Sequence, residues 1–287
     1  MAQNQSKAVK YTFSGHESFH CRQMWLKKGF DHLKQHRSFN DPDATVLLGV
    51  GKNMLTSIKF WLKSFGLLNE DETPNAFADF LFDNNGFDPY LEDDQSLWLL
   101  HYYLIKTNFS SIYSLIFNEF RKEKIQFTKD QFIAFALRKM EQVNIKTVAD
   151  DFDVFKKMYL EKSEDGKLSE DSFTGLLSEL QLLRTKEKGV YYIDQGERPT
   201  LSPEVLLYSI LDNDRYGYSI SLQSLEHDED GPGNVFALTR QELLDKIEML
   251  TSSYPWITYN DQAGVKEIQF KEKPSNPLNV LDLSICK

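Results

Sequence analysis

The clearest pattern of apolar and polar positions lies in residues 41–68, where two helical segments flank a glycine turn. Asp41 and Pro42 precede the first apolar segment, which predicts a short helix capped by Asp41 with Pro42 in its first turn. Gly-Val-Gly at 49–51 ends this helix, and a second helix is predicted over 52–64. One side of the second helix is expected to be buried and carries Met54, Ile58, Trp61 and Phe65.

The opposite side of the predicted 52–64 helix is polar. It carries the lysine stripe, which consists of Lys52, Thr56, Lys59 and Lys63. Ammonium groups and a hydroxyl along one line suit phosphates or base edges, so one interpretation is a helix-turn-helix that binds DNA. The other is an ordinary helical hairpin whose lysines only confer solubility. A phosphate-binding loop is excluded, because the two glycines are too close together and no Lys-Ser/Thr pair follows them.

Charge is distributed unevenly along the 287 residues. The net charge is −10, yet residues 1–69 carry +6, and nine acidic residues without any Lys or Arg follow over 70–105. A basic head followed by this acidic belt indicates that the head meets an anion, although solvated surface charge without a partner gives the same pattern. If the anion is DNA, the residues expected to contact it are Arg22, Lys28, Lys52, Asn53, Thr56, Lys59 and Lys63.

A second candidate site is the histidine cluster near the start of the chain. His16 and His20 lie four residues apart, with Glu17 beside the first. Three interpretations remain open: His16 and Glu17 transfer protons, all three residues bind a metal, or the histidines are structural. Residues 16–20 have the spacing of the metalloprotease pattern His-Glu-x-x-His, but Gly15 and the flanking aromatic residues argue against the helix that this pattern requires.

The acidic belt provides candidate metal ligands. Asp88, Glu92 and Asp93 are expected to hold Mg²⁺ or Mn²⁺ for phosphodiester hydrolysis, which needs only two or three convergent carboxylates. The order of residues that an EF-hand requires is missing. A structural alternative is that Asp93 or Asp94, with Asp94 favoured, caps a helix over about 95–107. That helix is almost wholly apolar, so its His101 is expected to lie in the core.

The second half of the chain predicts helices and two β-hairpins. The helices are expected near 129–142, 147–160, 171–184, 203–211 and 240–252. Hairpins near 190–193 and 256–270 follow helices, as in winged-helix modules, and the acidic character of these modules favours protein contacts over DNA. The predicted fold is therefore mainly α with minor β. It comprises a basic helix-turn-helix and nicking domain with the acidic belt (1–125) and a helical domain with winged-helix-like hairpins (126–287).

Composition excludes several classes of protein. Hydrophobic residues make up 41% of the chain, and no apolar run approaches the roughly 20 residues that span a bilayer. The N-terminus lacks the apolar centre of a signal peptide, so a cytoplasmic protein without membrane contact is expected. Cys21 and Cys286 are the two cysteines, which leaves no basis for a disulfide framework or a thiolate zinc cluster.

Three segments together resemble a known prokaryotic family, DUF4007. They are FSGHESFHCRQMWLKKGF (13–30), LLGVGKNMLTSIKFWLKSFGLL (47–68) and DPYLEDDQSLWLLHYYL (88–104). The resemblance implies membership of DNA phosphorothioation and anti-phage defence operons, beside a cysteine desulfurase, a PAPS-reductase-like protein and an ATPase. In the single-stranded version of this system, the family member is regarded as the DNA-nicking component. The resemblance supplies no catalytic motif.

The leading hypothesis is a DNA-binding protein that nicks one strand for phosphorothioation. The lysine stripe would hold DNA, the carboxylates of Asp88, Glu92 and Asp93 would hold the metal, and His16 and Glu17 would handle protons. A non-catalytic adaptor that recruits the sulfur-transfer enzymes is one alternative. An operon regulator, which would be a homodimer on a palindromic target, is another.

Overall fold

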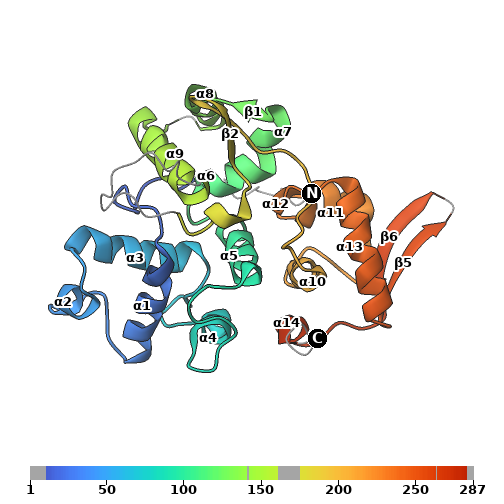
Figure 1. Cartoon of the computed structure of the whole chain (residues 1–287), viewed down its shortest axis with the longest axis horizontal. Helices are drawn as coiled ribbons and strands as arrows, with labels where there is room; N and C mark the ends of the chain where they lie inside the picture. The colour runs from blue at the N-terminus through green and yellow to red at the C-terminus, as the bar shows by residue number, and fades with distance from the viewer. Residues whose placement is uncertain (1–10, 141, 161–174, 263, 283–287) are drawn as a thin grey trace, which may run out of the picture.

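Helices dominate the fold, as the sequence predicts, and two small antiparallel sheets complete it (Figure 1). The structure, a computed structural model, describes residues 11–140, 142–160, 175–262 and 264–282. The helices are α1 (Gln23–Lys34), α2 (Ala44–Leu48), α3 (Lys52–Ser64), α4 (Ala76–Phe82), α5 (Asp94–Lys106), α6 (Ser111–Ser114), the π-helix η1 (Leu115–Phe120), α7 (Arg121–Glu123), α8 (Lys129–Lys139), α9 (Ile145–Tyr159), the short 3₁₀ helix η3 (Ser178–Leu180), α10 (Pro203–Leu211), α11 (Leu222–His227), α12 (Pro232–Val235), α13 (Arg240–Ser253) and α14 (Asn279–Asp282). Among the described residues, no helix is long and apolar enough to cross a bilayer.

The first three helices form a small unit in which α1 lies against α3. Their close approach depends on Gly29, because a Cβ there would lie 2.7 Å from a methyl of Leu62 and 2.9 Å from a methyl of Ile58. The prediction for α3 is confirmed at both ends, and Ile58 on its apolar side is fully buried. The helix, glycine turn and helix therefore occur where the pattern of the sequence places them.

The start of α2 differs from the prediction. The helix begins at Ala44 rather than directly after Asp41, and the Asp41 side chain does not cap it. Instead, the Asp41 carboxylate accepts the backbone N–H of Ser38 at 2.9 Å, and the Asp41 carbonyl accepts the N–H of Ala44 at 3.1 Å. Asp41 therefore stabilises the turn that precedes the helix.

Helix α5 runs through the middle of the molecule, between the N-terminal helices and the C-terminal half (Figure 1). Its His101 is fully buried, which confirms the expected core position. One ring nitrogen lies 2.7 Å from the hydroxyl of Tyr159 on α9, and the other lies 2.8 Å from the carbonyl of Val235 on α12. The imidazole therefore links α5 to two distant parts of the chain.

Burial of His101 makes the stability of the protein depend on pH. Desolvation lowers its pKa from 6.5 to about 3, so the folded state keeps the ring neutral while the unfolded chain takes up a proton below pH 6.5. The contribution of the neutral His101 ring to the free energy of unfolding is complete above pH 6.5 and is lost as the pH falls toward 3. Between pH 7.5 and pH 5 we expect His101 to account for a loss of about 2 kcal/mol in unfolding free energy. Urea denaturation of wild type and His101→Gln checks this, because the variant should lack that part of the pH dependence; parallel pH profiles would contradict it.

The strands are grouped into two sheets with the same internal order. They are β1 (Gln126–Phe127), β2 (Arg184–Glu187), β3 (Val190–Tyr192), β4 (Ser219–Ser221), β5 (Ile257–Gln262) and β6 (Val265–Phe270). The first sheet has the order β1-β3-β2 and the second β4-β6-β5, and all pairs are antiparallel. In each, a short strand is followed by helices and then by a hairpin that completes the sheet. Both predicted hairpins are present.

The helix predicted over 171–184 is wrong for its described part, and residues 171–174 lie outside the described residues. Residues 178–180 form only a 3₁₀ turn, and Arg184 already belongs to β2. The preceding backbone bonds to other elements: the N–H of Leu176 donates to the Cys21 carbonyl and that of Leu177 to the Met158 carbonyl. These long-range bonds replace the local bonds that a helix needs.

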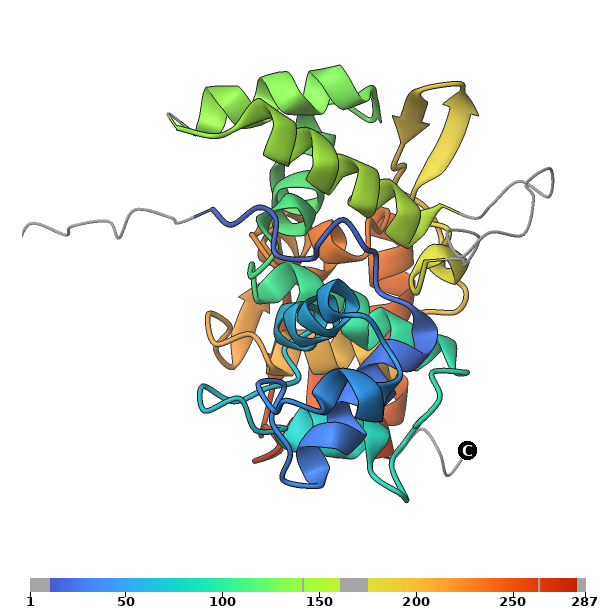
Figure 2. The same ribbon diagram turned by 90° about the vertical axis from the view of Figure 1, so that its left-hand side faces the viewer.

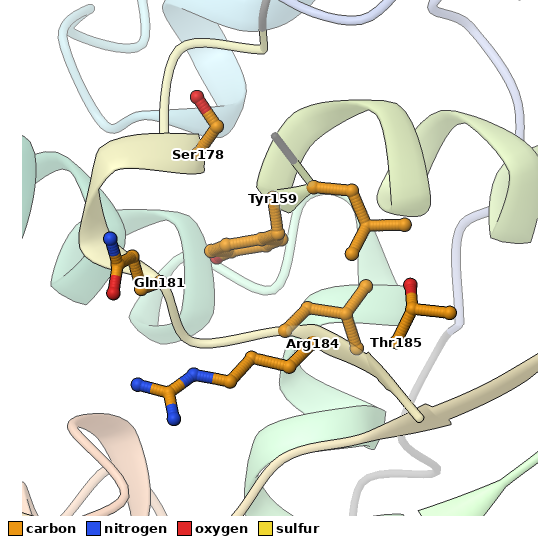
Figure 3. A pocket seen from close by; sticks show the side chains of 7 residues that line it. Tyr159, Ser178, Gln181, Arg184 and Thr185 are labelled. Atoms are coloured by element: carbon orange, nitrogen blue, oxygen red, sulfur yellow. The ribbon is translucent and has the colours of Figure 1, made fainter. Parts of the chain in front are cut away.

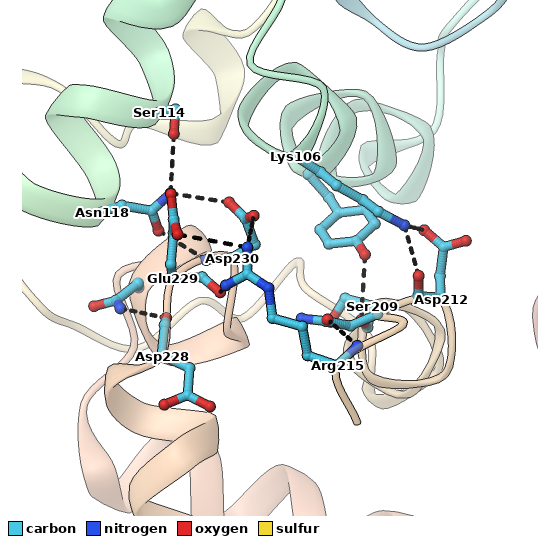
Figure 4. Close-up of polar contacts among 12 residues, drawn as sticks. Lys106, Ser114, Asn118, Ser209, Asp212, Arg215, Asp228, Glu229 and Asp230 are labelled. Carbon is cyan, nitrogen blue, oxygen red and sulfur yellow. Dashed lines mark hydrogen bonds and ion pairs between the residues drawn. The ribbon is translucent and has the colours of Figure 1, made fainter. Parts of the chain in front are cut away.

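Polar contacts join the two sides of the predicted boundary between residues 125 and 126 (Figure 4). Asn118 of η1 donates to Asp230 at 2.9 Å and accepts the Asp230 backbone N–H at 3.0 Å. Lys106 of α5 forms an ion pair with Asp212 at 2.6 Å. Burial raises the pKa of the Asp230 carboxyl, despite its bond from Asn118. The buried apolar side chains also form one continuous cluster across this point, and the division into two domains stays a prediction.

Candidate nucleic-acid interface

The turn between α2 and α3 presents an exposed polar tip. Lys52, Asn53 and Thr56 are exposed on the first turns of α3, and Lys28 of α1 reaches the same place, where its ammonium donates to the Leu48 carbonyl at 3.4 Å. Within the described part of the chain, neither Lys28 nor Lys52 forms an ion pair with a carboxylate. The tip therefore presents two unneutralised cations beside an amide and a hydroxyl.

Exposed aliphatic side chains lie next to this polar tip. Val46 and Leu47 of α2 are 79% and 53% exposed, although most large apolar side chains of the chain are buried. Gly49, with φ at +63°, ends α2 and turns the chain toward α3. Apolar groups flanked by ammonium groups are compatible with contacts to both sugars and phosphates.

The other half of the lysine stripe is partly neutralised, which the sequence did not predict. Lys59 and Lys63 both form ion pairs with Glu72, each with a different carboxylate oxygen, at 2.7 and 2.6 Å. Hydrogen bonds from the two lysines, Lys59 first, lower the pKa of the Glu72 carboxyl. The first residues of the acidic belt thus fold back on the stripe, and in the described part of the chain its α2 end is the part whose lysine has no carboxylate partner.

A hydrogen-bonded turn holds Glu72 in this position. Glu72 has φ at +66°, a conformation that non-glycine residues seldom adopt. The turn is closed by the N–H of Asn69, which donates to the Thr73 carbonyl at 2.8 Å, and by Asp71, which accepts the hydroxyl of Thr73 at 2.6 Å. These hydrogen bonds from Thr73 lower the pKa of the Asp71 carboxyl. The carboxylate of Glu72 is therefore positioned in advance against the two lysines.

Arg22 lies in a different setting from the α2–α3 tip. It precedes α1, and its guanidinium lies 5.2 Å from the centre of the Trp25 ring. It also lines a pocket of about 200 Å³ with residues that include Gly175 and Glu179. Stacking on the aromatic face of Trp25 holds this guanidinium against the protein itself.

The structure places His16 with Asp151 rather than with Glu17. His16 is buried, and its Nε2 lies 3.0 Å from Asp151 of α9, while its Nδ1 accepts the backbone N–H of Ser18 at 3.2 Å. Its ring also stacks on Trp61 of α3, with an angle of 11° between the planes. Both nitrogens are engaged, so this geometry favours the structural interpretation. Glu17 is exposed.

The acidic residues of the predicted metal site lie in one groove of about 1040 Å³. Asp88 accepts the backbone N–H groups of Glu92 and Asp93 at 3.0 and 2.9 Å, which fixes the loop before α5. Asp93, and not the favoured Asp94, caps α5 by accepting the N–H of Gln95 at 2.8 Å. Asp88 and Asp93 thus have structural tasks, and the predicted ligands do not form a three-carboxylate cluster among the described residues.

Three carboxylates of this groove have no protein partner in the described ranges. They belong to Glu92, Asp94 and Glu179, and the last of these was not among the predicted residues. Burial, followed by the charge of Asp93, raises the pKa of Asp94. The ammonium of Lys246 lines the same groove but is bound to Glu242 at 2.9 Å. The groove is therefore anionic and open to a cation.

Comparison with known proteins adds to this geometry. The family model described as "Protein of unknown function (DUF4007)" matches residues 13–284. The chain belongs to the DUF4007 family. The resemblance found in the sequence is thereby confirmed, and it extends over nearly the whole DUF4007 chain. Among curated proteins, none gives a significant match.

Two solved structures have the same fold as this DUF4007 chain. One is an SspB crystal structure, with 27% sequence identity and a TM-score of 0.81; it covers 96% of this chain and 88% of its own. The other is a magnesium ion-bound SspB crystal structure, with 26% identity, a TM-score of 0.80 and the same coverage. The DUF4007 chain is therefore SspB-like in fold.

The anionic groove of the DUF4007 chain suits Mg²⁺ in its chemistry. Magnesium binds oxygen ligands, keeps several waters and needs only one or two protein carboxylates. Glu92, Asp94 and Glu179 offer such oxygens without having to break an ion pair in the described part of the chain. The groove does not include His16 or Glu17 among its lining residues. The predicted catalytic residues are thus split between two places.

Proposed function

We propose that this DUF4007 chain is an SspB-like component of a DNA phosphorothioation-based anti-phage defence system, and that it binds DNA and nicks one strand. The observation that carries the proposal is the α2–α3 tip, where Lys28 and Lys52 remain without carboxylate partners in the described structure although the chain is strongly acidic. Such cations suit phosphates, and Asn53 suits a phosphate or base edge. The cysteine desulfurase, PAPS-reductase-like protein and ATPase that the family resemblance implies are its proposed partners.

We place the nicking centre in the anionic groove. A divalent cation, Mg²⁺ or alternatively Mn²⁺, would be held by Glu92 and Glu179 and would supply charge neutralisation at the phosphate. Burial raises the pKa of the Asp94 carboxyl, so Asp94 takes up a proton more readily than an ordinary aspartate and is the proposed proton carrier of the groove. Asp88 acts as a positioning residue, since it fixes the backbone of Glu92 and Asp93.

A plasmid assay tests the nicking centre. Supercoiled plasmid is incubated with the purified full chain and Mg²⁺, and the rate of open-circle formation is measured. We expect Glu92→Gln and Glu179→Gln each to lower this rate by about 10-fold, because each removes a ligand charge. Asp130→Gln, at an exposed acid outside the groove, is the control.

If both groove variants nick like wild type, the centre is not in this groove. If wild-type protein binds plasmid without nicking it, the adaptor hypothesis replaces the enzyme. Loss of nicking in a variant that still binds DNA separates true activity from a contaminant.

Glu72 is expected to compete with DNA for half of the lysine stripe. In Glu72→Gln, Lys59 and Lys63 lose their ion pairs and become free for phosphates. We expect duplex affinity to rise by about 3- to 10-fold and the salt dependence to steepen by about 1–2 in log–log slope, since each phosphate contact adds about 0.9. Fluorescence anisotropy of a labelled duplex at several salt concentrations measures both quantities.

The matched control is Glu70→Gln, which removes one exposed acidic charge of the same belt without an ion pair to the stripe. Equal effects of the two variants would mean that only the net charge matters. The competition would then be disproved.

A further inference from the structure

The sheet β1-β3-β2 exposes an aromatic ring between polar and basic side chains. Tyr192 lies on the central strand and is directly opposite Gln126 on one side and Arg184 on the other. Residues directly opposite in antiparallel strands point to the same face. The neighbouring row, Tyr191 with Phe127, lies against Phe152 of α9 and forms the inner face. Tyr192 is therefore on the outer face, where it is partly exposed.

A second cation extends over this outer face. The ammonium of Lys186, on the edge strand β2, donates to the side-chain oxygen of Gln126 on β1 at 2.9 Å. Because Gln126 and Tyr192 share a face, the lysine must cross the central strand on the side of Tyr192. Every residue of β2 is exposed, and Figure 2 shows the β2–β3 hairpin projecting from the helices. The ring is thus flanked by Arg184 and Lys186.

The start of β2 separates the two faces of the hairpin. Arg184 and Thr185 both border a pocket of about 280 Å³ with Tyr159 and Ser178, but their side chains leave the strand in different directions (Figure 3). The guanidinium of Arg184 extends away from Thr185, in agreement with the strand register. The positive charge therefore belongs to the outer face and not to the inner one.

Three acidic residues of the elements behind this sheet are paired elsewhere, whereas Glu187 of β2 lies opposite Val190 and therefore shares the outer face with Tyr192. Asp153 pairs with Lys129 and Lys156, both on the helices behind the sheet. Glu119 and Glu123 pair with lysine and arginine side chains of α8. By contrast, no ion pair involves Arg184, Lys186 or Lys188 within the described residues, so these hairpin cations keep their charge. The three cations of the hairpin therefore outnumber its single carboxylate, that of Glu187.

We propose that the outer face of β1-β3-β2 binds single-stranded nucleic acid. A base stacks on Tyr192, Arg184 and Lys186 bind the adjacent phosphates, and Lys188 at the end of the hairpin extends the basic track. A flat ring between cations is the arrangement used by single-strand binding surfaces, and only an unpaired base can stack on it. The order of strand, two helices and hairpin supports the comparison of this module with a winged helix, whose wing would be this hairpin. The proposal rests on the proposed function, because a strand end released at a nick becomes such a ligand once it unpairs.

Binding of three labelled probes to the full chain tests the proposal by fluorescence anisotropy: a 12-nucleotide dA oligomer, an abasic oligomer of the same length and a duplex. We expect Tyr192→Ala to weaken dA binding by about 10-fold, as stacking of one base implies, and to leave abasic binding unchanged. Tyr192→Phe should retain dA binding, since the ring remains. Arg184→Glu combined with Lys186→Glu should weaken both oligomers. Thermal melting checks that each variant is folded.

The proposal is overturned if Tyr192→Ala and the double charge reversal bind dA like wild type. It is also overturned if Tyr192→Ala weakens the abasic oligomer as much as dA, because the ring would then not stack on a base. Charge reversal of Lys28 and Lys52 tests the duplex interface separately. If that variant still binds duplex normally while Tyr192→Ala loses dA, the duplex interface fails and the single-strand site stands.

Discussion

Replacing both Lys28 and Lys52 by glutamate is expected to weaken duplex binding by about 100-fold at physiological salt and to lower the log–log salt slope by about 2. Two phosphate contacts are lost, and two negative charges are placed at the tip where Asn53 and Thr56 also lie. Neither lysine has a carboxylate partner in the described residues, so their removal disrupts no ion pair there. Fluorescence anisotropy of a labelled duplex over a salt series measures both effects.

The control for this variant is the same charge change on other elements. Lys124→Glu with Lys157→Glu reverses two exposed lysines, one at the end of η1–α7 and one on α9. Equal weakening by the two double variants would rule out a specific interface at the α2–α3 tip. We also expect a smaller effect for Lys59→Glu with Lys63→Glu, because Glu72 already neutralises part of their charge.

Asp151→Ala is expected to lower the unfolding free energy by about 3 kcal/mol, since it leaves buried donors without an acceptor. The carboxylate is almost completely buried and accepts the backbone N–H of Ser14 at 2.9 and 3.1 Å. Its Oδ1 also lies 3.0 Å from Nε2 of His16. Asp151 thereby ties the segment before α1 to α9. Urea denaturation measures the change.

Asp150→Ala is the matched control for the stability measurement, because Asp150 is the exposed neighbour on the same helix. We expect a change within about 0.5 kcal/mol there. If Asp151→Ala costs less than about 1 kcal/mol, the contact with His16 and Ser14 is not a structural link.

His16→Ala then distinguishes a structural from a catalytic histidine. Its nicking rate should fall only in proportion to the loss of folded protein. A fully folded His16→Ala protein that does not nick would restore the proton-transfer hypothesis.

Local patterns predicted much of the N-terminal half. The period of α3 gave its bounds and its buried side, and the apolar run after residue 94 gave α5 with a core histidine. Both patterns are local, since they depend on which residues share one side of a helix. The capping residue of α5 was assigned to the wrong neighbour, because Asp93 and Asp94 are chemically alike and only the backbone conformation selects between them.

Contacts between distant residues could not be predicted in this way. Glu72 reaches Lys59 and Lys63 through a turn whose conformation is rare for a glutamate. The partner of His16 is Asp151, 135 residues later in the chain. A helix was predicted over 171–184, but the backbone N–H groups of Leu176 and Leu177 bond to the carbonyls of Cys21 and Met158 on other elements. Each of these outcomes depends on packing between elements and leaves no periodic signal in the sequence.

Helix α12 serves as a common anchor for the first half of the chain. The carbonyl groups of Gly233 and Asn234 each accept a hydrogen bond from the guanidinium of Arg121 at 3.1 Å. The carbonyl of Val235 bonds the ring of His101. A recombinant fragment that stops before α12 would leave the guanidinium of Arg121 and the imidazole of His101 without these acceptors, among apolar side chains that have lost their covering. Trimming the protein to its lysine-rich beginning would therefore yield insoluble material rather than a miniature DNA binder.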